Sequence, residues 1–225
     1  MKRSEINDLL RDACAFFDEM NFKLPPYAYF SQNEWADKLS CGEYDEIRDN
    51  ALGWDITDFG SGDFEKVGLL LFTIRNGNYS DSKYQKPYAE KIMIVRENQI
   101  TPYHYHAKKM EDIINRGGGN LLIKLYNSTP EGEFADTDVT VNSDGRTYTV
   151  KAGTTVMLTP GESITLPQNL YHQFWGELGK GKVLVGEVSL VNDDRSDNRF
   201  YKPAGRFPDI NEDTSPLYLL NQDLQ

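Results

Sequence analysis

The sequence predicts a mainly β protein, a sandwich or barrel of short strands that is preceded by helices. From about Leu52 onward, short apolar runs alternate with Gly, Asp, Asn or Pro, a texture typical of about eight to ten strands and not of βαβ units. Residues 1–50 lack this texture and carry helical periodicity. We expect a single domain over residues 1–225, with a helical extension over 1–50, a β-barrel over 52–200 and a tail over 201–225.

The N-terminal segment predicts an amphipathic helix over about the first twenty residues. Ser4 is a candidate N-cap, and Leu24-Pro25-Pro26-Tyr27 is expected to end the helix. A second helix is expected from about Asn33 to Leu39, and residues 43–50 are expected to add another turn. The apolar residues that recur at three- and four-residue steps in the first helix are Ile6, Leu9, Leu10, Ala13, Phe16, Phe17 and Met20.

Turn residues divide the β region into its strands. Ser143-Asp144-Gly145-Arg146 lies between two strand-like runs and is a strong hairpin signal. The acidic tail after about Lys202 is expected to wrap around the outside of the barrel. The runs that predict strands are 68–74, 91–95, 120–126, 139–141, 146–150, 155–158, 163–166 and 182–191.

Composition limits the function. The formal net charge of −11 argues against nucleic acid or an anionic membrane as a partner, but it leaves room for a neutral sugar. Two cysteines, Cys14 and Cys41, are too few for a disulfide scaffold and favour a reduced cytoplasm. The N-terminus does not resemble a secretory signal, and no apolar run approaches the roughly 18 residues of a membrane span.

The three histidines of the chain predict a metal site. His104 and His106 form a His-x-His pair, Glu111 follows five residues later, and His172 lies further along. On an extended strand, side chains two residues apart share one face, so the pair would point the same way. Imidazole is a common ligand for transition metals. A His-x-His pair at the surface can arise by chance, but here all three histidines of the chain, with Glu111, could bind one metal ion.

The cage residues belong to two longer motifs, His-x-His-x4-Glu-x6-Gly ending at Gly118 and Gly-x5-Pro-x4-His ending at His172. These motifs resemble the two signatures of the cupin superfamily. The resemblance implies a cupin fold (a double-stranded β-helix, or jelly-roll barrel) with N-terminal helices packed outside. Asn169 and Gly176 depart from the glycine and asparagine usual in the second motif, and neither position is a ligand. The metal ligands that the resemblance implies are His104, His106, Glu111 and His172.

The chain is also similar, over most of its length, to bacterial D-lyxose isomerases. This resemblance implies a ketol isomerase that interconverts D-lyxose and D-xylulose through a metal-stabilised cis-enediol, without ranking D-lyxose against D-mannose. It also implies Mn²⁺ and a homodimer. Co²⁺, Fe²⁺ or Zn²⁺ can substitute for Mn²⁺, since all four accept nitrogen and oxygen ligands. The segments that carry the similarity are 52–55, 90–93, 112–120, 170–175 and 185–194.

Isomerisation moves a proton between adjacent carbons, so a base and a proton donor are needed beside the metal. Lys109 lies between the histidine pair and Glu111, and we expect it to exchange a proton with a sugar oxygen, its neutral form favoured by a nearby dication. Glu187 lies in an otherwise apolar strand. If it faces the lumen, its pKa would be raised, which suits a general base; we prefer it to Asp194.

Four residues are candidates for contacting the sugar. Lys91 is expected to bind hydroxyl groups or to balance the charge of Glu187. Asp194 lies in an acidic loop that could equally be a solvated turn. Trp54 and Phe174 could stack on the C–H face of the sugar, although aromatic residues in a barrel more often belong to its core.

Three other functions fit the same cage. An iron-dependent dioxygenase would consume oxygen and need an apolar pocket. A non-catalytic sugar-binding cupin would bind without turnover. A phosphosugar isomerase would need a local cluster of Arg and Lys, which the acidic balance disfavours.

Overall fold

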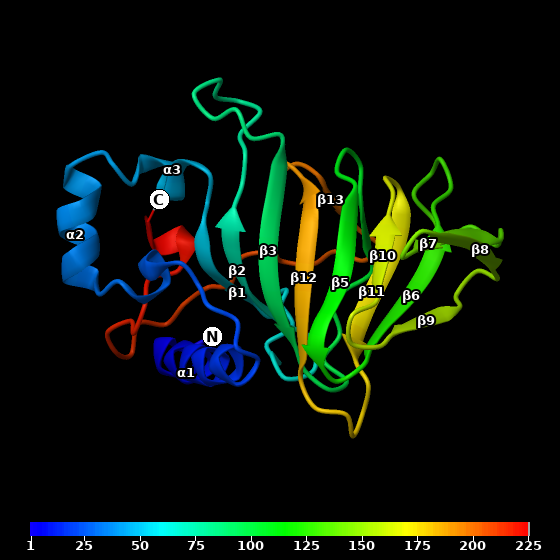
Figure 1. The fold of residues 1–225 in the computed structure, drawn as a ribbon, viewed down its shortest axis with the longest axis horizontal. Helices are drawn as coiled ribbons and strands as arrows, with labels where there is room; N and C mark the ends of the chain where they lie inside the picture. The colour runs from blue at the N-terminus through cyan, green and yellow to red at the C-terminus, as the bar shows by residue number, and fades with distance from the viewer. Residues whose placement is uncertain (225) are drawn as a thin grey trace.

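The computed structural model describes residues 1–224 and consists mainly of two antiparallel β-sheets, with helices against one outer face (Figure 1). The mainly β prediction is therefore confirmed. The larger sheet has the order β1 (Gly53–Thr57), β2 (Leu69–Arg75), β3 (Tyr88–Val95), β12 (Val183–Leu190), β5 (Glu111–Gly118), β10 (Ser163–Leu166), β7 (Val139–Ser143) and β8 (Arg146–Val150). The smaller sheet has the order β13 (Asn198–Phe200), β4 (His104–His106), β11 (Leu170–Gly176), β6 (Leu121–Asn127) and β9 (Thr155–Leu158).

The predicted hairpin joins β7 to β8. Asp144 and Gly145 at its tip both have positive φ angles, 50° and 79°. Two successive left-handed residues match the type I′ turn, whose twist suits antiparallel strands. The hairpin prediction is therefore confirmed. Aspartate followed by glycine suits this turn because both residues tolerate a left-handed backbone better than most.

The main core fills the space between the two sheets. Strand β6 shows how the sequence builds it, since alternate residues along the strand are buried while their neighbours are partly exposed. This period of two is what one buried strand face requires. The inner core includes Leu71, Met93, Val95, Ile113, Leu121, Ile123, Leu125, Val139, Val141, Leu158, Ile164, Leu166, Val183 and Val185.

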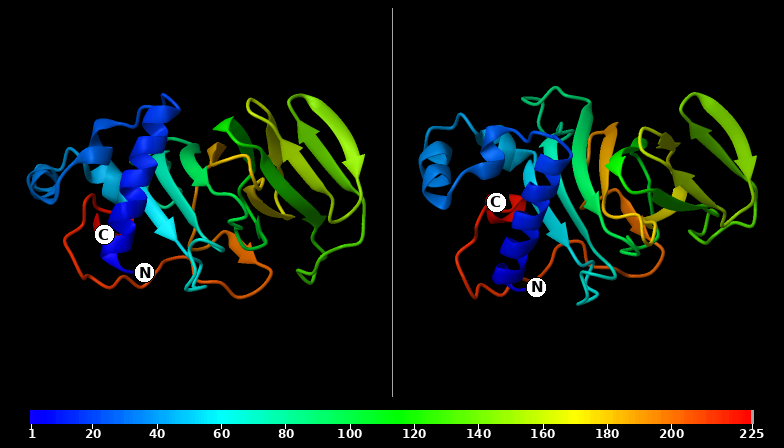
Figure 2. Two further views of the ribbon diagram at one scale, coloured as in Figure 1. Left: turned by 90° about the horizontal axis from the view of Figure 1, so that it is seen from below. Right: turned by 60° about the horizontal axis from the view of Figure 1, so that its bottom comes forward.

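A second core lies on the other side of the larger sheet, under α1 (Arg3–Glu19) (Figure 2). Strand β1 is buried at every position, because Trp54 and Ile56 on one face pack in this second core and Asp55 on the other face pairs with Arg206 of the tail. The helix contributes the apolar face expected from the sequence. Its members pack with residues of β1, β2, β3 and β12; the cluster includes Ile6, Leu10, Ala13, Phe16, Phe17, Ile56, Leu70, Phe72, Ile92, Ile94 and Leu184.

Helix α1 covers the predicted extent of about the first twenty residues, but the residues that cap and end it differ from the prediction. The N-cap is Lys2, whereas the Ser4 hydroxyl lies within the helix and donates to Asp213 Oδ2 at 2.7 Å. The helix also ends before the two prolines, since Asn21 takes a left-handed φ of 52°. The tail offers Ser4 a carboxylate partner, a long-range contact that local capping rules cannot anticipate.

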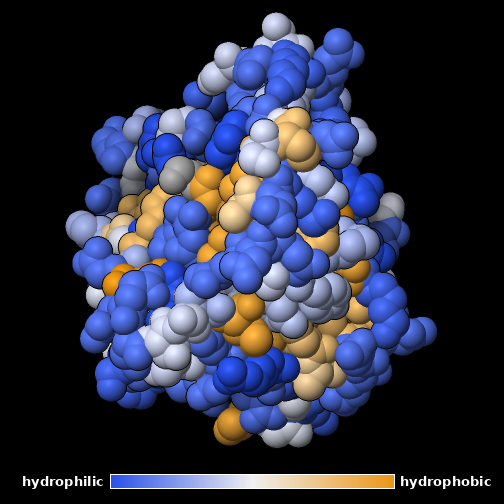
Figure 3. Space-filling model, turned by 90° about the vertical axis from the view of Figure 1, so that its left-hand side faces the viewer, coloured by the Kyte–Doolittle hydropathy of each residue, from blue (hydrophilic) through white to orange (hydrophobic). Residues whose placement is uncertain are grey.

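The remaining helices form a small third cluster. They are η1 (Pro26–Tyr29), α2 (Gln32–Ser40), α3 (Asp45–Asp49) and η2 (Asn221–Leu224). The predictions over 33–39 and 43–50 are confirmed, and Ser31 with Glu34 forms the capping box of α2. Trp35, Leu52 and Leu224 join the cluster's buried core. The face that these helices present is largely hydrophilic, with separate apolar areas (Figure 3).

The C-terminal tail runs back along the helices. Its Asn211 exchanges backbone hydrogen bonds with the first residues of the chain, and the buried Arg3 pairs with Glu212 at 2.6 Å and Asp223 at 2.9 Å. One tail residue, Arg206, reaches a cavity at the inner core, so the tail does more than cover the outside. Within residues 1–224, no helix combines the length and apolar character needed to cross a membrane.

Candidate active site

Three histidine side chains meet at one end of the inner core. His104 and His106 lie on β4, and His172 on β11 is the cross-strand partner of His104. The ring centroid of His172 lies 4.2 Å from that of His104 and 5.6 Å from that of His106. One ring nitrogen of each histidine lies within 4.8 Å of the others. The expectation that an extended strand places the pair on one face is therefore confirmed.

Hydrogen bonds orient the rings. His104 Nδ1 bonds to the Pro102 carbonyl at 2.8 Å, and His172 Nδ1 to the Leu170 carbonyl at 3.0 Å. These bonds leave each Nε2 free for another partner, and His172 Nε2 is buried without a hydrogen bond. The two Glu111 carboxylate oxygens lie 3.3 Å from His106 Nε2 and 3.3 Å from His172 Nε2. The donor set fits a divalent cation, with the carboxylate beside the imidazoles.

The protonation states also fit a cation. Burial and the neighbouring imidazoles hold the pKa of His104 well below its usual value, and burial lowers the pKa of His172 to about 4. Burial alone would raise the pKa of Glu111, but Lys109 and His106 outweigh it and keep that pKa well below its ordinary value. Neutral imidazoles and an ionised carboxylate are the forms that bind metal.

The two departures from the second motif are explained by the backbone. Asn169 has a φ of 61°, the left-handed conformation that asparagine tolerates, and its N–H donates to the His106 carbonyl at 2.9 Å. At Gly176, a Cβ atom would lie 2.8 Å from the Arg96 carbonyl oxygen. A side chain at position 176 would therefore displace the neighbouring loop.

Lys109 joins the histidine cluster to Glu187. Its Nζ lies 2.7 Å from Glu111 Oε2 and 2.8 Å from Glu187 Oε1, and its side chain is 2% exposed. Burial alone would lower the pKa of Lys109, but the charges of Glu111, Glu187 and Asp194 outweigh it and raise that pKa. Among the protein's own side chains Lys109 is therefore protonated, and the neutral form expected beside a bound dication stays a prediction.

Glu187 faces the cavity, opposite Lys91 in the pairing of β12 with β3. Its Oε1 lies 3.4 Å from Lys91 Nζ, and both side chains are nearly buried. Burial alone would raise the pKa of Glu187, but Lys109 and Lys91 lower it overall. The expected raised pKa is wrong, because the sequence could not show that two ammonium groups would flank this carboxylate.

Arg206, Asp55 and Asp194 form an ion-pair group beside this cavity. The sequence did not indicate Asp55 or Arg206 as site residues. Arg206 Nη2 lies 2.6 Å from Asp55 Oδ2 and 2.8 Å from Asp194 Oδ2. Burial would raise the pKa of Asp194, but Lys91 and Arg206 hold it well below its usual value. Asp55 lies within the buried strand β1, the same signal that marked Glu187. Nothing local distinguishes Arg206 in the tail.

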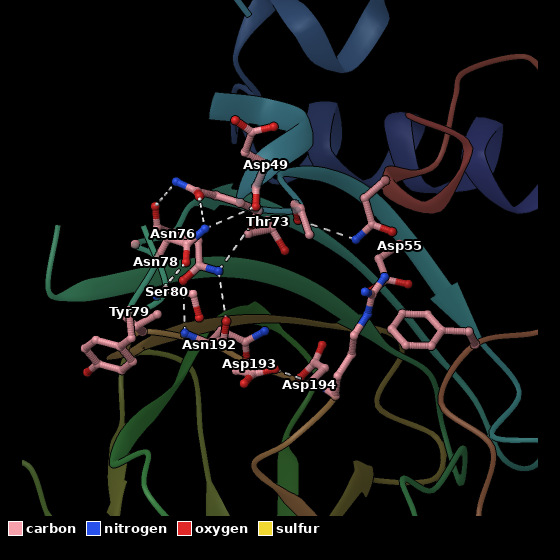
Figure 4. Close-up of a pocket in the computed structure, with 17 residues that line it drawn as sticks. Asp49, Asp55, Thr73, Asn76, Asn78, Tyr79, Ser80, Asn192, Asp193 and Asp194 are labelled. Carbon is pink, nitrogen blue, oxygen red and sulfur yellow. Dashed lines mark hydrogen bonds between the residues drawn. The ribbon is translucent and has the colours of Figure 1, made fainter. Parts of the chain in front are cut away.

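Both ionic and apolar side chains line the cavity. Phe174 lines it together with the predicted residues Lys91, Lys109, Glu187 and Asp194. A second, polar pocket shares Asp194 with this cavity. In Figure 4, Asn76 and Asn78 lie at one end of this second pocket, and Asp55 and Asp194 lie at the other. Its asparagines are Asn50, Asn76, Asn78, Asn192 and Asn221.

The structure separates Trp54 from the candidate site. Its ring packs on the outer face of the larger sheet against Phe17 and Phe72, with centroids 6.0 and 5.1 Å away. Its Nε1–H donates to the Ala28 carbonyl at 2.7 Å, and the residue is 1% exposed. Of the two expectations for Trp54, stacking on the sugar or packing in the core, its position matches the second.

Trp54→Phe is therefore expected to change stability and not sugar affinity. The substitution leaves the Ala28 carbonyl without its buried donor, which costs about 1–3 kcal/mol in the free energy of unfolding. Denaturant unfolding would measure this loss, and a steady-state assay would measure KM. An increase in KM with unchanged stability would instead place Trp54 at the sugar.

Comparison with known proteins adds a family. The family model described as D-lyxose isomerase matches residues 1–224. A D-lyxose/D-mannose isomerase from Serratia proteamaculans is 51% identical over 220 residues, which cover 98% of this chain and 96% of that protein. Another from Escherichia coli O157:H7 is 50% identical over 223 residues, covering 99% and 98%.

Solved structures show the same fold at low sequence identity. L-ribose isomerase from Cellulomonas parahominis, with L-ribose, has a TM-score of 0.60 at 16% identity and covers 94% of this chain and 98% of its own. L-ribose isomerase from Acinetobacter sp. DL28, with L-ribose, has a TM-score of 0.60 at 15% identity, with the same coverage.

Proposed function

The chain belongs to the D-lyxose isomerase family, and on this basis we propose that it interconverts D-lyxose with D-xylulose and D-mannose with D-fructose. It is a sugar isomerase, and the relatives' names support these two aldoses. One observation carries the proposal. The buried ammonium group of Lys109 lies between Glu111 at the histidine cluster and Glu187 at the ionic wall, so metal ligand and acid–base groups share one cavity.

His104, His106, His172 and Glu111 would hold a divalent metal, and we propose Mn²⁺. The buried, unpartnered His172 Nε2 and the adjacent Glu111 oxygens support this assignment. When bound, the ion would polarise the sugar carbonyl and stabilise the negative charge of the enediolate. Mn²⁺, Co²⁺, Fe²⁺ and Zn²⁺ all accept nitrogen and oxygen ligands, so metal identity has to be measured.

Glu187 and Lys109 would move the protons. From aldose to ketose, the Glu187 carboxylate would take the proton from C2 and return it to C1. The Lys109 ammonium would donate a proton to O1 and recover one from O2. The hydrogen bond between the two side chains, 2.8 Å long, supports an ionised base and a protonated lysine. These are the forms that this direction would require.

The remaining wall residues would bind the sugar. Lys91 and Asp194 would hydrogen-bond hydroxyl groups, and the Phe174 ring would face C–H groups. Arg206 ties Asp194 to Asp55, which limits the freedom of Asp194 to act as the base. We also propose that the protein works as a homodimer, as the family resemblance implies, and in the cytoplasm, which its two free cysteines favour.

An aldose panel under nitrogen would test the function. After chelation and addition of Mn²⁺, D-lyxose should yield D-xylulose and D-mannose should yield D-fructose, identified by product analysis. Isomerisation needs no oxygen, so the rate should be the same in air. Turnover that requires oxygen would point to a dioxygenase, and sugar binding without product would point to a non-catalytic cupin.

A further inference from the structure

Asp197, a buried carboxylate outside the predicted site, lies behind the histidine cluster. It directly precedes β13, whose first residue Asn198 pairs with His106. The Asp197 residue is 3% exposed, and its backbone carbonyl accepts a hydrogen bond from the Ala107 N–H at 3.2 Å. Two segments that are distant in the sequence therefore meet at this side chain.

Two backbone N–H groups donate to the Asp197 carboxylate, and a third nitrogen, His106 Nδ1, faces it. Oδ1 accepts from the Lys108 backbone N–H at 2.6 Å, and Oδ2 accepts from the Lys109 backbone N–H at 3.1 Å. Oδ2 also lies 3.7 Å from His106 Nδ1, a buried atom without a hydrogen-bond partner. A shift of about 1 Å would close this gap to ordinary hydrogen-bond length.

The other two histidines are held differently. The Nδ1 atoms of His104 and His172 each meet a backbone carbonyl two residues earlier, whereas His106 faces a carboxylate. A carboxylate behind a ligating imidazole fixes the tautomer that presents Nε2 and makes that nitrogen more basic. His106 Nε2 already points towards Glu111, at 3.3 Å from its Oε2.

We propose that Asp197 is a positioning residue that aligns both His106 for the metal and Lys109 for proton transfer. The inference rests on the proposed metal site. By accepting from the Lys108 and Lys109 backbone, the carboxylate holds the turn from which Lys109 reaches Glu111 and Glu187. By facing His106 Nδ1, it holds a ligand of the same centre.

Asp197→Asn tests this role, because an amide has one acceptor oxygen where two backbone N–H groups and His106 Nδ1 face the carboxylate. Mn²⁺ should bind about 10–100-fold more weakly than to the unmodified protein, as measured by the free-ion EPR signal during titration of chelator-treated protein. At saturating Mn²⁺, kcat should remain lowered, because Lys109 is still misplaced. Asp193→Asn is the matched control, since Asp193 accepts from Arg195 N and Ser196 N in the same loop.

The outcomes are distinguishable. Unmodified protein that fails to bind Mn²⁺ would overturn the proposed function and this role with it. Normal Mn²⁺ affinity in Asp197→Asn, or an equal loss in Asp193→Asn, would overturn only the role of Asp197. If Asp197→Asn does not fold, NMR of the unmodified protein with Zn²⁺ should show three hydrogen-bonded ring N–H protons; only two would contradict the proposal.

Discussion

His172→Ala is expected to abolish turnover. The imidazole is 1% exposed, and its Nε2 has no hydrogen-bond partner other than what the cluster would hold. Loss of this ligand opens the cage and weakens metal binding. A bound ion contributes several kcal/mol of charge stabilisation, and losing about 4 kcal/mol corresponds to about a thousandfold in rate. Ketose formation and bound Mn²⁺ should fall together.

Tyr171→Phe is the matched control for His172→Ala. Tyr171 is the preceding residue on the same strand, and its hydroxyl donates to the Gly132 carbonyl at 2.6 Å, away from the metal ligands. Loss of this hydrogen bond should cost about 1 kcal/mol of stability and leave Mn²⁺ content unchanged. Full activity of the unmodified protein after exhaustive chelation would contradict the metal-dependent mechanism.

Glu187→Gln is expected to lower kcat by at least about a hundredfold, the scale on which general-base catalysis contributes. The amide keeps the shape of the carboxylate and an acceptor for Lys109, but it cannot take the carbon-bound proton. Mn²⁺ affinity should remain, because Glu187 is not among the proposed ligands. Stopped assays of ketose formation at saturating sugar would measure kcat.

Glu90→Gln provides the control for this substitution. Glu90 lies next to Lys91 on β3 and pairs with Arg75 at 3.1 Å. Its substitution removes one negative charge, as Glu187→Gln does, but leaves the lining of the cavity unchanged. A change below about threefold in Glu187→Gln would remove Glu187 from the base role. A larger loss in Asp194→Asn would transfer that role to Asp194.

Isotope exchange distinguishes two ways of moving the hydrogen. With Glu187 as base, deuterium from D₂O should appear at C1 of the ketose, because the abstracted proton can exchange before it returns. Complete absence of solvent deuterium, with direct transfer between C2 and C1, would support a hydride shift. In that case Glu187→Gln should affect kcat far less.

Local pattern was sufficient for much of the fold. The short apolar runs between turn residues predicted most strands, and the Asp144-Gly145 pair predicted its hairpin. The ends of α1 were not predictable in this way, since Ser4 found a partner more than two hundred residues away. Propensity acts over a few residues, whereas such contacts depend on the folded chain.

The same distinction between local pattern and long-range contact applies to the candidate site. Spacing on one strand brought His104 and His106 together, and the motifs added Glu111 and His172. The pKa direction of Glu187 is opposite to the expectation, because its carboxylate meets the ammonium groups of Lys109 and Lys91. No local sequence pattern distinguished Asp197 or Arg206, because their importance comes from contacts with residues distant in the sequence.

The sequence by itself therefore determined the β architecture and the helical extension, because periodicity is a property of neighbouring residues, and the resemblance of its two motifs to the cupin signatures implied the four candidate metal ligands. Only the tertiary structure decided which charges surround Lys109 and Glu187, that Trp54 belongs to the core, and that Asp55, Asp197 and Arg206 reach the site. Electrostatic interactions and burial depend on distance in space, and folding brings together residues that the chain keeps far apart.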